Sequence, residues 1–171
     1  IITIVGFGFL LFFILSGDNR HNLNVDPKFE LQSIYIGQRF PNISVALDGT
    51  VVATWGRESV LAKLSKDGGV TWGPEIIVAK EGIHGGGLVV DRASGDMLIF
   101  VQDKHPPADI YMYRSKDNGE TWKKEKPTIQ KDLNNNKPEM HMAEHGIYLK
   151  YGALRGRLIR SSRVYGNEKG Y

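Results

Sequence analysis

Hydrophobic and polar residues alternate along the chain in short runs that are joined in pairs by turns. The stretches "NISVALDGTVVATW" (42–55) and "GGGLVVDRASGDMLIFV" (85–101) each hold two runs rich in β-branched residues around an Asp-Gly or Ser-Gly-Asp turn. Short runs of this composition between turn residues predict β-strands. "SVLAKLS" (59–65) and "DIYMYRS" (109–115) predict one further strand after each pair.

An eight-residue phrase then occurs twice. "SKDGGVTW" begins at Ser65 and "SKDNGETW" begins at Ser115, 50 residues later. The extended stretches "PEIIVA" (74–79) and "KPTIQ" (126–130) follow the two phrases and predict a fourth strand in each unit. Self-similarity at this period is typical of repeat architectures, and it suits the four-stranded blade of a β-propeller.

A third unit begins at "HGIYLKYGALRGRLIRSSRVY" (145–165), which predicts two strands around a turn after the polar loop "KDLNNNKPEM" (131–140). The sequence therefore predicts an all-β fold with two complete blades and the start of a third. The domain boundaries follow in order: residues 1–17 as a signal peptide or signal anchor, 18–37 as a lead-in segment, and 38–171 as a partial propeller. Within the propeller, blade 1 covers about 38–80, blade 2 about 83–130 and the start of blade 3 about 139–171.

The repeated phrase has the chemistry of a stiff turn. Its aspartates, Asp67 and Asp117, can accept hydrogen bonds from turn amides, while Gly69 and Gly119 permit positive φ. The tryptophans can pack the turn against the blade. The phrase contains no nucleophile with a neighbouring base, so we expect its residues to be structural: Ser65, Asp67, Gly69, Thr71, Trp72, Ser115, Asp117, Gly119, Thr121 and Trp122.

The N-terminus is apolar from Ile1 to Leu15, and the small residues Ser16 and Gly17 follow. A run of this length suits the h-region of a signal peptide, and it is short for a membrane span. We therefore expect a secreted, periplasmic or cell-surface protein, with membrane contact only through an N-terminal anchor. A buried strand or helix is the alternative. Since the chain begins at Ile1 without a basic n-region, we expect further sequence before it.

Charge and cysteine content narrow the function classes. The net charge is +3, and basic residues alternate with acidic ones as in "KKEK" (123–126), so we expect no nucleic-acid partner. The absence of cysteine excludes disulfides, thiolate metal sites and a cysteine nucleophile. No motif indicates a cofactor.

The repeated phrase resembles the Asp-box of the bacterial neuraminidase repeats, a family that includes six-bladed exo-α-sialidases and non-catalytic propellers. "QRFPNI" (38–43) is similar to the Arg-Ile-Pro motif that opens sialidases, with Phe40 in place of isoleucine. The resemblance makes Arg39 one of the arginines that bind the sialic-acid carboxylate. A guanidinium suits this task because its planar fork pairs with both carboxylate oxygens.

The same resemblance supplies further candidate residues. "ATWGR" (53–57) places Arg57 in the substrate pocket, and the short connection that follows leaves Glu58 as a candidate acid. "FVQDKHPPAD" (100–109) places Asp103, a second candidate acid, and His105 at the same rim. "MAEHGIYL" (142–149) places Glu144 and His145 near the pocket. In the family the tyrosine nucleophile, its glutamate partner and two more arginines come from later blades.

We therefore predict a sialidase-like glycoside hydrolase that removes terminal sialic acid or a related acidic sugar from a glycan. Because the family's nucleophile has no counterpart in these residues, we expect the chain alone to be inactive. The alternative is a non-catalytic Asp-box propeller that binds a glycan or a protein. The connection between Arg57 and the next strand favours this alternative, because it is too short to carry the family's acid/base aspartate.

Two motifs suggest other chemistry. "HMAEH" (141–145) fits the His-x-x-Glu-His string of zinc peptidases, but Pro138, Gly146 and the β-rich run that follows leave no room for the helix that a zinc site requires. We expect no metal. "HGGG" (84–87) resembles an esterase oxyanion loop, but the chain lacks the Gly-x-Ser-x-Gly elbow that this reading requires.

Overall fold

The computed structural model describes residues 31–36, 39–56, 58–82, 87–105, 108–138 and 145–162. The chain divides into two compact units, Ile1–Ser33 and Ile34–Tyr171, and the architecture below is that of the second unit. Every regular element in the described ranges is a β-strand, which confirms the all-β prediction. In this part of the chain, no helix has the length and apolar character that crossing a membrane requires.

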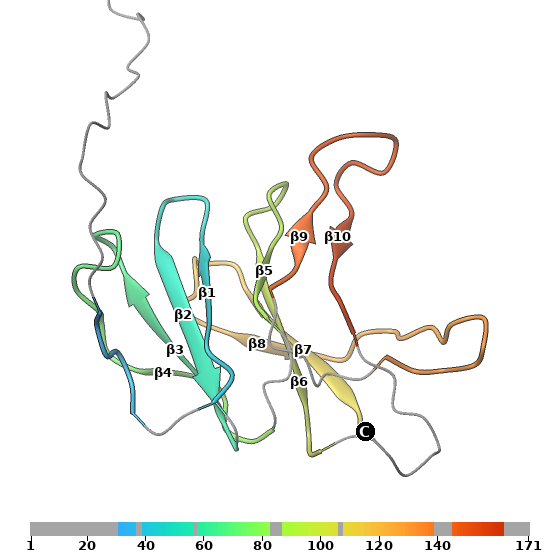
Figure 1. Cartoon of the computed structure of the whole chain (residues 1–171), viewed down its shortest axis with the longest axis horizontal. Coiled ribbons are helices and arrows are strands. Elements are labelled where there is room, and N and C mark those ends of the chain that lie inside the picture. Colours follow the sequence, from blue (N-terminus) through green and yellow to red (C-terminus); the bar gives the residue numbers. More distant parts are fainter. Residues whose placement is uncertain are drawn as a thin grey trace, which may run out of the picture. The chain divides into compact units, whose positions relative to one another are not determined.

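Two four-stranded antiparallel sheets follow each other along the chain, each with its strands in sequence order (Figure 1). The first sheet consists of β1 (Asn42–Val45), β2 (Val51–Gly56), β3 (Val60–Ser65) and β4 (Ile76–Ala79). The second consists of β5 (Val89–Val90), β6 (Met97–Gln102), β7 (Ile110–Ser115) and β8 (Lys123–Glu125). A hairpin of β9 (Ile147–Tyr148) and β10 (Leu158–Ile159) follows.

The central hairpins of the two sheets have the same register. Ser65, which opens the first phrase, lies opposite Val51, the first residue of β2. Ser115 lies opposite Met97, the first residue of β6, in the same way. The repeat in the sequence is therefore a repeat in strand pairing, and each position of the β2–β3 hairpin has an equivalent in the β6–β7 hairpin.

The fourth strand of the second sheet differs from the prediction. We predicted a strand over "KPTIQ" (126–130), and this is wrong, because β8 occupies Lys123–Glu125 and ends before Pro127. Proline has no amide hydrogen to donate to a neighbouring strand, so it disfavours a strand interior. The fourth strand predicted within "PEIIVA" (74–79) is confirmed as β4.

The main core lies between the two sheets. It contains buried residues of both: Ala46, Val52, Val60, Ala62, Val78, Ala79, Leu88, Met97, Ile99 and Val101. A smaller core lies on the other face of the first sheet, around the fully buried Trp55. Tyr35 stacks on Trp55 with ring centroids 4.5 Å apart, and this burial raises the pKa of the Tyr35 phenol. Apolar burial of this kind stabilises a fold by about 1.5–3 kcal/mol for each large side chain.

The first strands of successive units contact one another: β1 contacts β5, and β5 contacts β9. The amide of Leu88 donates to Asn42 Oδ1 at 3.4 Å across the first junction. At the second junction a Cβ on Gly146 would lie 2.7 Å from Val89 Cγ2, closer than real side chains approach. Glycine at this position therefore allows β9 to pack directly against β5.

Candidate functional site

Because consecutive strands are antiparallel, the connections between them lie alternately at the two ends of each sheet. One end, here called the rim, comprises Arg39–Pro41, Glu58–Ser59, Lys80–Gly82 and Asp103–His105. The opposite end carries the two repeat turns, Ser65–Trp72 and Ser115–Trp122. The strand order alone thus separates the candidate catalytic and binding residues from the repeated phrase.

Backbone hydrogen bonds hold the rim of the first sheet together. The Gly56 amide donates to the carbonyl oxygen of Arg39 at 2.9 Å, and the Gly82 amide donates to the carbonyl oxygen of Glu58 at 3.1 Å. The side chains of Arg39 and Glu58 are exposed. The Arg39 guanidinium carbon lies 5.0 Å from the centroid of the Phe40 ring, a cation–π contact that orients the arginine.

Phe40 has a φ of 57°, in the left-handed region that bulky residues rarely adopt. Backbone conformations of this kind tend to occur at functional sites, where the surrounding structure holds them. Phe40 directly follows Arg39, and both belong to the "QRFPNI" motif (38–43).

Gly82 joins the rims of the two sheets. A Cβ at this position would lie 2.6 Å from Val101 Cγ1 and 2.7 Å from the Gln102 carbonyl oxygen, and φ is +116°. Gln102 itself is buried, and its Nε2 donates to the Ala108 carbonyl oxygen at 3.1 Å, which fixes the connection between β6 and β7. Sequence reasoning missed both residues, because neither belongs to a motif and because the contacts of Gly82 are with a strand of the next sheet.

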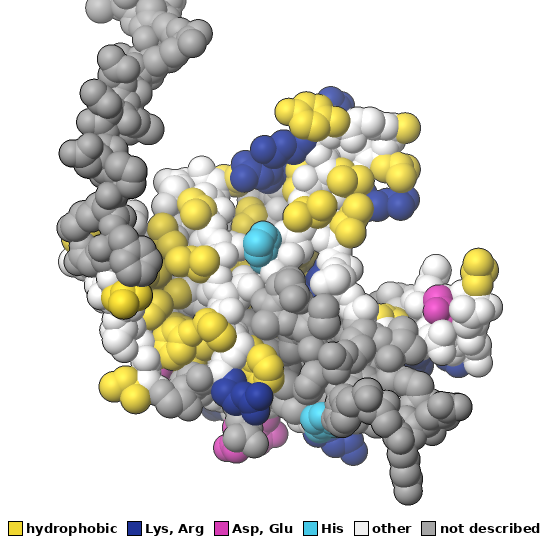
Figure 2. Space-filling model, viewed as in Figure 1, with side chains coloured by type: hydrophobic (Ala, Val, Ile, Leu, Met, Phe, Trp, Pro, Cys, Tyr) yellow, Lys and Arg dark blue, Asp and Glu magenta, His cyan; other side chains and the backbone are white. Residues whose placement is uncertain are grey.

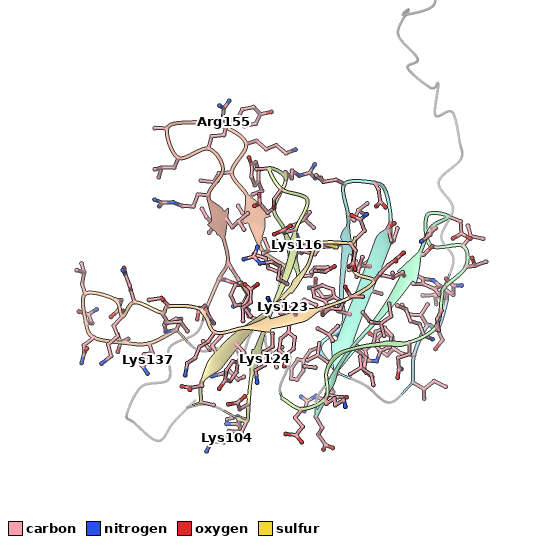
Figure 3. All side chains as sticks on the ribbon, turned by 180° about the vertical axis from the view of Figure 1, so that it is seen from behind. Lys104, Lys116, Lys123, Lys124, Lys137 and Arg155 are labelled. Carbon is pink, nitrogen blue, oxygen red and sulfur yellow. The ribbon has the colours of Figure 1, made fainter. Side chains whose placement is uncertain are left out.

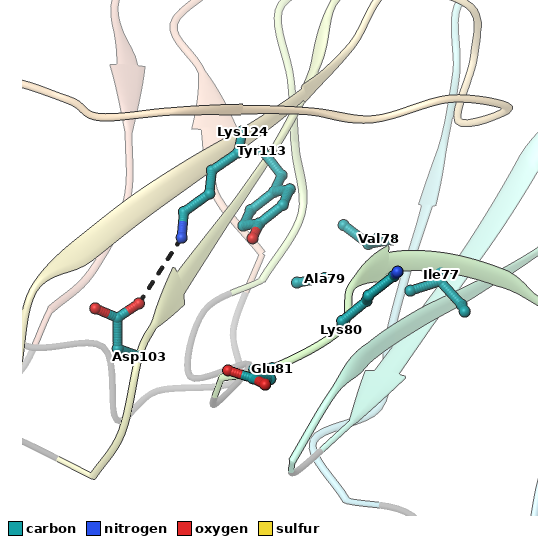
Figure 4. Close-up of a pocket in the computed structure, with 8 residues that line it drawn as sticks. All are labelled: Ile77, Val78, Ala79, Lys80, Glu81, Asp103, Tyr113 and Lys124. Atoms are coloured by element: carbon teal, nitrogen blue, oxygen red, sulfur yellow. Dashed lines mark ion pairs between the residues drawn. The ribbon is translucent and has the colours of Figure 1, made fainter.

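Asp103 borders a groove of about 560 Å³ between the outer strands of the two sheets (Figure 4). The segment Ile77–Glu81 lines one side, and Asp103, Tyr113 and Lys124 line the other. Lys124 Nζ lies 4.0 Å from Asp103 Oδ1 and 3.6 Å from the centroid of the Tyr111 ring. Since the Asp103 and Lys124 side chains are both about half exposed, their ion pair stabilises the fold little and leaves the carboxylate accessible.

The rim thus holds four of the seven candidate catalytic and binding residues, and His145 instead lines a separate groove along β1, β5 and β9. Arg39 and Glu58 lie at the rim of the first sheet, while Asp103 and the exposed His105 lie at the corresponding end of the second. Arg57 and Glu144 lie outside the described residues, as do residues 141–144 of the "HMAEH" string. Among the described residues, no group of three or more His, Asp or Glu side chains is arranged to hold a metal ion.

The first repeat turn is held by hydrogen bonds within the phrase. Ser65 Oγ donates to Asp67 Oδ1 at 2.7 Å and accepts from the Gly69 amide at 2.8 Å. Asp67 accepts from the Thr71 amide at 2.9 Å and from the Thr71 hydroxyl. Gly69 has a φ of 96°. All the side-chain oxygens of the phrase are therefore engaged in forming the turn, which leaves no free nucleophile.

The second repeat turn repeats these bonds one for one. Ser115 Oγ donates to Asp117 Oδ1 at 2.8 Å and accepts from the Gly119 amide at 2.8 Å. Asp117 accepts from the Thr121 amide at 2.9 Å and from the Thr121 hydroxyl. Gly119 has the same φ of 96°.

These hydrogen bonds favour the charged form of both aspartates. The Thr71 hydroxyl and amide and the Ser65 hydroxyl lower the pKa of Asp67 from 3.8 to about 2. Burial of Asp117 works against its charged form, but hydrogen bonds from Thr121 and Ser115 outweigh it, so its pKa is also lowered. Both carboxylates are therefore ionised at neutral pH, as acceptors within a turn should be.

Comparison with known proteins adds no further assignment: no protein-family model matches the chain, and no curated protein matches it.

Proposed function

We propose that the chain forms part of a sialidase-type β-propeller whose rim binds a terminal sialic acid or a related acidic sugar. The observation that carries this proposal is the arrangement of two equivalent four-stranded sheets with equivalent turns. In a propeller, blades of this kind surround an axis with their first strands innermost. The contacts of β1 with β5 and of β5 with β9 support that arrangement.

A bare face on the first sheet also supports the propeller. Ile43 and Val45 of β1 are 57% and 53% exposed. By the shared register their equivalents are Leu88, which is fully buried, and Val90, which packs against the main core. The second sheet uses these positions to pack on the first sheet. In the first sheet the same positions, Ile43 and Val45, are exposed. This is what a propeller blade would show where a neighbouring blade packs on it in the complete ring.

The rim has the chemistry that an acidic sugar requires. Arg39 is exposed there, and guanidinium pairs with carboxylate through two parallel hydrogen bonds. Glu58 and Asp103 are the candidate carboxylates for acid catalysis of glycosidic cleavage, which passes through an oxocarbenium-like transition state. His105, which is exposed at the corresponding end of the second sheet, contributes to the proposed pocket wall. Arg57 lies outside the described residues and stays a candidate from the resemblance alone.

A non-catalytic propeller that binds a glycan or a protein is the second candidate function. Only residues 57–59 connect β2 to β3, so this part of the rim holds no loop long enough to place an acid over the sugar. A propeller with this short connection would bind the acidic sugar through Arg39 without cleaving it.

Ligand-observed NMR with 3′-sialyllactose tests the proposal. We expect saturable binding to the unmodified chain, weakened about tenfold or more by Arg39→Ala, because one charge-assisted pair is lost. Lys137→Ala removes an exposed cation elsewhere and should leave the affinity unchanged. Absence of sialoside binding, or equal binding by Arg39→Ala, would overturn the proposal. We expect no hydrolysis of a fluorogenic sialoside by this chain alone, and hydrolysis would favour the enzyme over the binding module.

A further inference from the structure

A second groove, of about 390 Å³, runs along the first strands of the three units, and this volume is within the range typical of small-ligand sites. Its lining combines positions on β1, β5 and β9 with residues beside them: Ile43, Ser44, Val45, Val90, Arg92, His145, Gly146, Ile147, Tyr148 and Lys150. We call it the inner groove. Its existence depends on the close packing of Gly146 against Val89, which brings β9 beside β5.

Among the residues that the structure describes, the charged side chains on the wall of the inner groove are all basic. Arg92 and Lys150 lie there with His145, and this described part of the lining includes no carboxylate. Asp91, the neighbour of Arg92, directs its oxygens into its own turn, where they accept from the Ala93 amide and the Ser94 hydroxyl, each at 2.9 Å. The carboxylate nearest Arg92 in sequence is therefore engaged in the turn.

The surface beside the inner groove is also basic. Residues 145–162 contain four lysines or arginines and no Asp or Glu. The positive charge of this segment alone therefore exceeds the net charge of the whole chain, which is +3. Figure 2 shows Lys and Arg side chains over the β9–β10 hairpin, and no Asp or Glu side chain there on the face in view. A groove in a surface with one sign of charge raises the local concentration of ligands of opposite charge.

The inner groove is distinct from the rim. Arg92 follows β5 and Lys150 follows β9, so both lie in turns at the end of the strands that carries the repeat turns. Arg39 and Glu58 lie at the opposite end of the first sheet. A ligand held by Arg92 and Lys150 would therefore not be the sugar held by Arg39.

We propose that the inner groove binds an acidic oligosaccharide, with a carboxylate or sulfate group between Arg92 and Lys150. Guanidinium and ammonium groups suit these anions. Tyr148 and the aliphatic side chain of Ile147 offer apolar contact to the carbon face of a sugar ring. The choice of a glycan rests on the function proposed above, whereas the preference for an anion rests on the charges of the groove alone.

Calorimetric titration of the chain with a sulfated hexasaccharide tests the inner groove. We expect saturable binding that the double variant Arg92→Ala/Lys150→Ala weakens at least about tenfold, and that Arg92→Lys/Lys150→Arg largely restores. The matched control is Lys123→Ala/Lys137→Ala, which removes two exposed charges; Figure 3 shows both lysines apart from Arg155 at the tip of the hairpin. This control should bind as the unmodified chain does. The two alanine double variants should have the same thermal melting curve as the unmodified chain, since the four replaced side chains are all exposed.

Arg39→Ala separates this inference from the proposed function, because it should weaken sialoside binding at the rim about tenfold or more and leave hexasaccharide binding intact. Three results would overturn the inference: no hexasaccharide binding, equal weakening by the control variant, or equal affinity for a DNA oligonucleotide of the same charge. Lack of binding by a neutral hexasaccharide supports it.

Discussion

The two repeat turns share the hydrogen bonds among their Ser, Asp, Gly and Thr residues but have different surroundings. Gly69 and Gly119 share a φ of 96°, yet a Cβ on Gly69 would meet only Trp72, at 3.9 Å. A Cβ on Gly119 would lie 3.0 Å from Leu64 Cδ2 and 3.3 Å from Val52 Cγ2. The first turn is thus open at this glycine, and the second packs against the first sheet.

Other contacts of the second turn agree with this difference. Asn118 Nδ2 donates to Asp48 Oδ2 at 2.8 Å, and Lys66 Nζ lies 2.9 Å from Glu120 Oε1. Trp122 packs against the main core, whereas Trp72 packs against the small core around Trp55. The comparison shows that the phrase determines the conformation of its own turn, and that the packing of the turn depends on the sheet that precedes it.

Replacing Gly69 or Gly119 by alanine should show most strongly the difference between the conformation of a repeat turn and its packing against the first sheet. Gly69→Ala should cost about 1–2 kcal/mol of unfolding free energy, because alanine is strained at positive φ. Gly119→Ala should cost about 1–3 kcal/mol more, because its methyl group also enters a packed contact with the first sheet. Urea unfolding of both variants measures the difference. Equal losses would show that the second turn does not pack on the first sheet.

Removing the serine hydroxyls should instead affect both turns equally. Ser65 and Ser115 are buried to the same extent and make the same hydrogen bonds with their turns. Serine→alanine at either position leaves a turn amide without its acceptor, and we expect a loss of about 1–3 kcal/mol from each. The two variants, measured by the same urea unfolding, should agree closely. A much larger effect at one of them would mean that the turns are not equivalent local structures.

The aspartates should give the smallest effect, visible only in acid. Asp67 has a folded pKa of about 2 against an ordinary value of 3.8, so its stabilising contribution is full above about pH 4 and is lost as pH falls toward 2. Asp117 acts in the same direction. Unfolding free energy should therefore decline between pH 4 and pH 2, and Asp67→Asn/Asp117→Asn should flatten that decline. An unchanged slope in the double variant would contradict the hydrogen-bonded role of the carboxylates.

The sequence alone predicts the all-β class and the strands of the two central hairpins, because alternation and turn residues are local signals. It misplaces the fourth strand of the second sheet, since the run around Pro127 has strand-like composition but lacks an amide that pairing requires. The rim contact through Gly82 and the inner groove could not be predicted, because each depends on how separate units pack. Neither leaves a motif in the chain.

The packing of one sheet against the next is the central claim, and zero-length carbodiimide crosslinking tests it most directly. This reagent joins only amines and carboxylates that are in contact. We predict a crosslink between Lys66 and Glu120, which lie in different repeat turns. Lys126 Nζ and Asp109 Oδ2 lie 3.1 Å apart and belong to the same sequence repeat, so this pair provides the positive control. Mass spectrometry that finds both crosslinks supports the stacked sheets, whereas the control crosslink without Lys66–Glu120 would contradict them.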